Sequence, residues 1–178
     1  LYKSDNDLAK KAPKEYDEAI AGQTEICANI FNKPISIIAG SAGTGKTTAY
    51  ETLQSALTYL HDTRFLYQKV NTHVLNPKSI RLEELYGDLN EHTHEWHDGI
   101  VAKIAKNVVD DKNSHHHWIV FDGPVDALWI ENMNTVLDDN KTLCLTNGQR
   151  IKLPPTVAFL FEVRDLAVAS PATVSRCG

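Results

Sequence analysis

The chain has 178 residues, a length that suits one domain with a hydrophobic core and leaves little room for a second. Hydrophobic residues make up 42%, charged residues 23%, and the formal net charge is −5, so we expect a globular domain that does not bind nucleic acid. No apolar stretch approaches the roughly 18 residues that span a bilayer, and no signal-peptide pattern opens the sequence, so we expect no membrane partner. The cysteines (Cys27, Cys144 and Cys177) are odd in number and far apart, which favours three buried thiols over a disulfide or a zinc site.

The first part of the chain changes character near residue 30. Residues 1–20 are charged and weakly patterned, and Pro13 interrupts any helix there. Residues 1–20 could form a lead-in helix or a mobile arm. We therefore expect a lead-in segment over residues 1–30 and one core over residues 31–178.

The core begins with an alternation of strand and helix signals. Ile35–Ala39 is a short apolar run that ends in glycine, as buried parallel strands do. From Lys46 onward, apolar residues at helical spacing predict an amphipathic helix; they are Ala49, Leu53, Ala56, Leu57 and Leu60. Residues 65–70 predict a second strand, and Ser79 is expected to cap a short helix that carries Glu83 and Glu84 near its positive end.

The alternation continues to the end of the chain. Residues 100–108 predict a helix, Trp118–Phe121 a dense strand closed by Asp122 and Gly123, and Leu128–Leu137 a helix. Asn147-Gly148 between two strand-like segments predicts an inserted hairpin whose two turn residues both have positive φ. Residues 156–163 predict another strand, and Ser170-Pro171 starts a final helix. This order predicts a three-layer α/β fold with a mainly parallel sheet.

One motif in this framework points to chemistry. It fits G-x-x-x-x-G-K-[ST] at every fixed position, between a predicted strand and a predicted helix, and its residues are Gly40, Ser41, Ala42, Gly43, Thr44, Gly45, Lys46 and Thr47. Glycines let backbone N–H groups turn toward an anion, and the helix N-terminus adds positive potential. We expect ATP or ADP with Mg²⁺ here, bound by these residues and Thr48, with Lys46 on the β- and γ-phosphates and Thr47 on the metal.

The second half of such a site is an acid at the end of a neighbouring strand. Asp122 supplies it, and we expect Asp122 to hold Mg²⁺ through its water shell. The next position, where a glutamate would polarise the attacking water, is Gly123. Without that group, hydrolysis loses a factor of roughly 10²–10⁴. Asp126 and Glu131 are the nearest candidate acids to replace it.

The stretch from Asn76 onward resembles the dynein heavy chain family, in particular the second AAA+ module of its ring. The resemblance rests on blocks that include Asn76–Ile80, Leu85-Tyr86-Gly87, Thr93–Gly99, Phe121–Asp126, Trp129–Lys141 and Ala169–Gly178. The sequences of Gly123–Ala127 and Ala169–Thr173 are more similar to those of axonemal members of the family than to those of cytoplasmic members. The resemblance implies the large α/β subdomain of a P-loop AAA+ module, without its helical lid, that binds nucleotide structurally with little or no hydrolysis.

The resemblance also implies a partner arrangement. Arg176 matches the arginine finger, which would act on the nucleotide of the adjacent AAA+ module. Other dynein subunits would be further partners, microtubules would bind only other regions, and the location would be the cytoskeleton of the cytoplasm or of a cilium or flagellum axoneme. The usual polar sensor cannot be assigned, because Glu162, Arg164 and Asp165 occupy its neighbourhood.

We do not expect a metal site at either of two histidine groups. The first, His92/His94/His97, lies within one of the blocks that carry the resemblance. The second, His115–His117, lies in a polar stretch that predicts an exposed loop. Two alternative functions remain open. One is a freestanding P-loop ATPase or small kinase that uses Asp126 or Glu131, and the other is an interaction scaffold with a vestigial loop.

Overall fold

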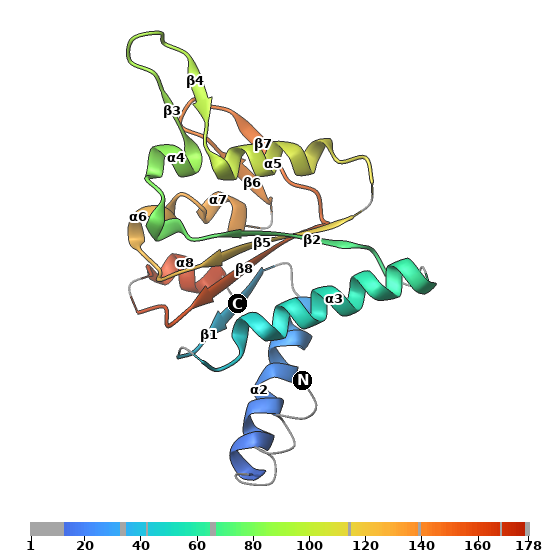
Figure 1. The fold of residues 1–178 in the computed structure, drawn as a ribbon. Coiled ribbons are helices and arrows are strands. Elements are labelled where there is room, and N and C mark those ends of the chain that lie inside the picture. Colours follow the sequence, from blue (N-terminus) through green and yellow to red (C-terminus); the bar gives the residue numbers. More distant parts are fainter. Residues whose placement is uncertain are drawn as a thin grey trace.

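The computed structural model describes residues 13–32, 35–41, 43–64, 67–113, 115–138, 140–167 and 169–176 (Figure 1). In chain order its helices and strands are α2 (Pro13–Asn32), β1 (Ile35–Ala39), α3 (Lys46–Arg64), β2 (Val70–Leu75), the 3-10 helix η1 (Pro77–Ser79), α4 (Leu82–Tyr86), β3 (Gly87–Leu89), β4 (Trp96–Asp98), α5 (Ile100–Asp110), β5 (His116–Asp122), α6 (Ala127–Glu131), α7 (Asn134–Leu137), β6 (Thr142–Cys144), β7 (Arg150–Lys152), β8 (Val157–Val163) and α8 (Pro171–Arg176).

A four-stranded sheet in the order β1-β8-β5-β2 forms the centre of the molecule, and all its neighbouring strands pair in parallel. The predicted α/β fold with a mainly parallel sheet is confirmed. Because the strands are parallel, their carboxyl ends share one edge of the sheet, where ligand sites of open α/β folds lie.

Helices cover both faces of this sheet, which gives the three layers (Figure 1). Successive side chains of β5 face opposite sides, as the period of a strand requires. Trp118 and Val120 pack in the cluster shared with α2 and α3, whereas Ile119 and Phe121 pack in the larger cluster on the other face. The apolar run Trp118–Phe121 therefore contributes side chains to the core on both faces of the sheet.

The second strand lies later than predicted. Residues 65–70 were expected to form it, but β2 is Val70–Leu75, and residues 65–66 lie outside the described part of the chain. Only Val70 of β2 is buried, because this strand is at the edge of the sheet. An edge strand of this kind lacks the apolar pattern that a buried strand shows.

Two helix predictions are also corrected. The helix expected over Leu128–Leu137 is divided into α6 and α7 by a turn at Asn132 and Met133. Ser79 does not cap α4; it ends η1, and its hydroxyl donates to the Asn76 carbonyl oxygen at 2.9 Å. The Asn76 side chain is the cap, since its Oδ1 accepts from the Lys78 N–H at 3.1 Å.

The inserted hairpin β6–β7 is present, but its turn differs from the prediction. Only Gly148 of the Asn-Gly pair has positive φ (85°). Leu145 and Gln149 close the loop with a 2.9 Å backbone bond, so a single left-handed glycine is sufficient here, as in three-residue hairpin loops. Cys144, expected to be buried, is exposed, because it points away from its buried neighbour Leu143.

Candidate nucleotide site

The P-loop, which is the motif Gly40–Thr47, joins β1 to α3 at the carboxyl edge of the sheet. Gly40, Gly43 and Gly45 have φ values of 150°, 82° and 77°, a region that side chains with a Cβ rarely adopt. The loop thus takes a path that only its glycines allow without strain. Ala42 lies outside the described residues, and Thr48 is exposed.

Lys46 folds back over this loop. Its Nζ donates to the carbonyl oxygens of Gly40 and Ser41, both at 2.9 Å, and the residue is only 8% exposed. The Thr44 hydroxyl also donates to the Ser41 carbonyl, at 3.0 Å. These bonds hold the ammonium group inside the curve of the loop, where a phosphate chain would require it.

Asp122 ends β5 with its side chain exposed at the same edge. The following Gly123 donates its N–H to the Glu162 carbonyl oxygen at 3.2 Å. A Cβ at Gly123 would lie 2.9 Å from Asn76 Oδ1, so the chain leaves no room for a larger residue unless Asn76 moves. The position expected to lack a catalytic acid is therefore also crowded.

Glu162 is a site residue whose role the sequence did not reveal. It lies in β8, in register with Ile38 of β1 and Asp122 of β5. The Thr47 hydroxyl donates to its carboxylate, at 2.8 Å from Oε1 and 2.9 Å from Oε2. From the sequence, Glu162 was placed in the neighbourhood of the polar sensor but was assigned no role.

The carboxylates also affect a buried neighbour. Burial, followed by the negative charges of Glu162, Glu51 and Asp122, raises the pKa of Tyr50 to about 12. Tyr50 lies one helical turn after Thr47 and is itself buried. The phenol of Tyr50 therefore stays neutral beside these carboxylates.

A cavity of about 490 Å³ lies at this edge of the sheet, lined by the P-loop residues Gly40, Ser41 and Lys46, by the ends of β5 and β8, and by Gly123, Pro124 and Arg164. Oxygen ligands such as the Thr47 hydroxyl and the Asp122 carboxylate are those that Mg²⁺ prefers. A buried lysine and a helix N-terminus beside them suit phosphate groups. The residues present therefore fit a magnesium–nucleotide complex.

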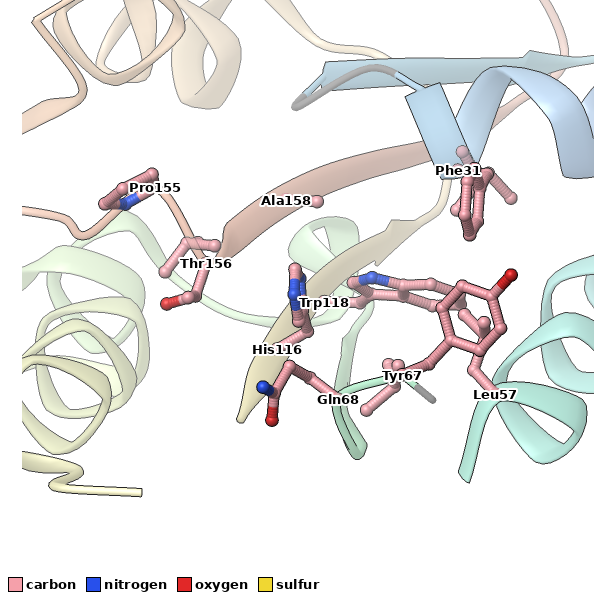
Figure 2. Close-up of a pocket in the computed structure, with 12 residues that line it drawn as sticks. Phe31, Leu57, Tyr67, Gln68, His116, Trp118, Pro155, Thr156 and Ala158 are labelled. Atoms are coloured by element: carbon pink, nitrogen blue, oxygen red, sulfur yellow. The ribbon is translucent and has the colours of Figure 1, made fainter. Parts of the chain in front are cut away.

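A second cavity, of about 310 Å³, lies at the amino ends of the strands (Figure 2). Phe31 and Tyr67 flank one side of it, with ring centroids 5.9 Å apart, and Trp118 and His116 lie beyond them. None of its lining residues belongs to the P-loop cavity.

The other predicted acids do not line the P-loop cavity. Asp126 caps α6 by accepting from the Leu128 N–H at 2.9 Å, and it lies 3.5 Å from Lys78 Nζ. Glu131 is exposed at the end of α6. Arg176 closes α8, but its side chain lies outside the described part of the structure.

The histidine run is not the exposed loop that was predicted. His116 and His117 begin β5, and His117 is buried between Asp111, 3.0 Å from its Nε2, and His73, 3.2 Å from its Nδ1. In the part of the chain that the structure describes, no group of three or more His, Cys, Asp or Glu side chains is arranged to hold a metal ion. The described helices include none long and apolar enough to cross a membrane.

Comparison with known proteins agrees with this geometry. Residues 35–177 match the family model of the AAA domain, dynein-related subfamily. The chain is 57% identical over 145 residues to human dynein axonemal heavy chain 6, covering 80% of this chain and 4% of that protein. It is 43% identical over 182 residues to rat dynein axonemal heavy chain 1, covering 98% of this chain and 4% of that protein.

A flagellar dynein heavy chain is similar to this chain over a comparable length. The dynein-1-beta heavy chain of the inner arm I1 complex of Chlamydomonas reinhardtii is 51% identical over 148 residues, covering 80% of this chain and 3% of that protein. The chain thus spans only a few per cent of the length of these relatives. With its P-loop, its parallel sheet and these matches, the chain belongs to the dynein-related AAA domain family, and its relatives are axonemal dynein heavy chains.

Proposed function

We propose that this chain is the second AAA+ module of an axonemal-type dynein heavy chain and binds ATP or ADP with Mg²⁺ as a structural ligand. The observation that carries this proposal is the P-loop arrangement: Lys46 and Asp122 line one cavity at the edge of the sheet, and Thr47 is hydrogen-bonded to Glu162 of the same cavity. The Lys46 ammonium would contact the phosphates, and Thr47 and Asp122 would hold the cation. A ligand that binds only the folded form stabilises it, so the nucleotide would brace the module.

Little or no hydrolysis is expected at this site. The bound cation would neutralise phosphate charge. The position of a water-activating acid is occupied by Gly123, and a side chain there would have to displace that of Asn76. Asp126 is occupied in capping α6, and Glu131 is on the outer surface. These placements favour a binding module over a freestanding enzyme that uses either acid.

The module would act within a larger assembly. Its proposed partners are the adjacent AAA+ modules of the same heavy chain, one of which Arg176 would serve as an arginine finger, and other dynein subunits. Microtubules would bind through other regions. The names of its relatives favour the cytoskeleton of a cilium or flagellum as its location.

The test is calorimetric binding of ATP and ADP, with and without Mg²⁺, together with phosphate release. We expect Mg²⁺-dependent binding without turnover. Lys46→Ala should weaken binding about ten- to hundredfold, as the loss of a charged hydrogen bond of about 1.5–3 kcal/mol predicts. Lys152→Ala, on the exposed side of β7, removes the same charge away from the site and should bind normally.

Two results would overturn the proposal. If the unsubstituted chain binds neither nucleotide, the loop is vestigial and the chain is a scaffold. If it releases phosphate steadily and Asp126→Asn stops this, the chain is a self-sufficient ATPase.

A further inference from the structure

Glu162 occupies the centre of the nucleotide site although no part of the P-loop motif includes it. Its strand lies between β1 and β5, and the backbone is fixed on both sides: Gly40 N donates to the Val163 carbonyl oxygen and Gly123 N to that of Glu162, both at 3.2 Å. The carboxylate therefore stands between the loop and Asp122. Its two oxygens lie at nearly equal distances from the Thr47 hydroxyl oxygen (2.8 and 2.9 Å).

The direction of this hydrogen bond decides what Thr47 can do. A hydroxyl has one proton and two acceptor lone pairs. A carboxylate can only accept, so the Thr47 proton points to Glu162, and the lone pairs of its oxygen remain available for a cation. Outer carboxylates orient the ligands of metal sites in this way.

Charge gives Glu162 a second effect. Together with Asp122 it places two negative charges in a cavity where Lys46 contributes one positive charge and Arg164 lies at the wall. Burial is the main cause of the raised pKa of the Tyr50 phenol, and the charges of both carboxylates contribute to it. A polyphosphate anion entering without a cation would meet this repulsion.

We propose that Glu162 is a positioning residue of the cation site, which orients the Thr47 hydroxyl and makes nucleotide binding strictly dependent on a divalent cation. This inference rests on the proposed function, because it assumes that nucleotide binds at the P-loop. It assigns to β8 a part of the site that the motif residues do not supply.

The test measures the affinity for a fluorescent ADP derivative while Mg²⁺ is titrated, using the 178-residue chain. Glu162→Gln keeps the shape but removes the charge. We expect it to raise the Mg²⁺ concentration for half-maximal binding by about tenfold, the lower range for loss of an outer ligand. Affinity in EDTA should stay the same or increase, because the repulsion is gone.

Three further variants separate the possible causes. Glu162→Asp keeps the charge but shortens the reach to Thr47, and we expect an intermediate shift in the Mg²⁺ midpoint. Glu91→Gln removes one charge from the exposed tip of the β3–β4 hairpin and should not shift it. In a Thr47→Val background, Glu162→Gln should have a much smaller effect than in the unsubstituted chain. Thermal unfolding of each variant checks that it is folded.

The outcomes distinguish this inference from the proposed function. An unsubstituted chain that binds Mg²⁺-ADP, with an unchanged Mg²⁺ midpoint in both Glu162 variants, would overturn the role of Glu162 and leave the proposed function standing. An equally large shift in the Thr47→Val background would show that Glu162 acts by charge alone and not through Thr47. Absence of nucleotide binding by the unsubstituted chain would overturn both.

Discussion

The side-chain oxygen of Asn76 lies 2.9 Å from the point where a Cβ on Gly123 would stand, and the same oxygen accepts from the Lys78 N–H. Two strands thus meet here: Asn76 follows β2, and Gly123 follows β5. Any side chain at position 123 has to displace the residue that caps η1. Gly123 and Asn76 are therefore coupled, and substitutions at one should depend on the other.

This coupling is measurable as stability. Gly123→Ala should lower the free energy of unfolding by about 1 kcal/mol, because Asn76 must leave its capping position. In an Asn76→Ala background the same substitution should cost much less, since the obstacle is already gone. Urea denaturation of the four proteins gives the comparison. Equal costs in the two backgrounds would show that the two residues are independent.

The same contact bears on activity. Gly123→Glu introduces the acid that related P-loop sites use, but the new side chain meets Asn76. We expect the Asn76→Ala/Gly123→Glu double variant to gain more ATP turnover than Gly123→Glu alone, measured by phosphate release. Gly123→Gln in the same background is the control, because its amide cannot accept a proton from water. Turnover in that control equal to the glutamate variant would contradict an acid–base role.

A pH dependence of stability follows from two imidazoles beside the buried His117, those of His73 and His116. Burial, and then the charge of His117, lower the pKa of His73 and of His116 from 6.5. Below about pH 6.5 the unfolded chain therefore binds more protons than the folded chain does. The contribution of these histidines to the free energy of unfolding is complete above that pH and decreases as the pH falls further. The ring of His73 stacks on that of His117, with ring centroids 5.6 Å apart. His73→Phe keeps a ring there but removes the imidazole, so it should reduce the slope of stability against pH between pH 7 and pH 5.

Chemical denaturation at several pH values measures the slope. His92→Phe, which removes an imidazole from the exposed tip of the β3–β4 hairpin, serves as the control and should keep the original slope. If both variants show the same slope, the imidazole of His73 is not a source of the pH dependence.

A buried hydroxyl ties α4 to α6. The Tyr86 hydroxyl donates to the Trp129 carbonyl oxygen at 2.6 Å, and burial raises the pKa of this phenol. Tyr86→Phe leaves that carbonyl without its donor, so we expect a loss of about 1–3 kcal/mol in the free energy of unfolding. Tyr59→Phe, at a residue 66% exposed, should change it by much less. A similar small change in both would mean that the carbonyl finds another donor.

The parts of the site that lie close together in the sequence were predictable, and the parts that depend on strand order were not. Gly40–Thr47 is one contiguous motif, and Asp122 closes an apolar run, so local pattern and chemistry identify both. The contact between Thr47 and Glu162 joins residues 115 positions apart, and it exists only because β8 lies next to β1. Neither spacing nor composition contains that information.

The errors in the predicted positions of helices and strands have similar causes. Edge strand β2 lacks an apolar pattern, so the prediction moved to the more apolar residues before it. The turn that divides α6 from α7 includes the fully buried Met133, in a stretch whose apolar residues continue at helical spacing. In both places tertiary packing outweighs local preference.

The position of β8 has a consequence for how the protein is made. This strand comes last of the four in the chain, yet it lies between β1 and β5 and pairs with both. On a ribosome, the P-loop is synthesised more than a hundred residues before the strand that joins it to Asp122. A nascent chain that ends before residue 157 thus carries the phosphate-binding motif but not the assembled site. Nucleotide can stabilise the module only after this late insertion, and until then the edges of β1 and β5 depend on other protection from aggregation.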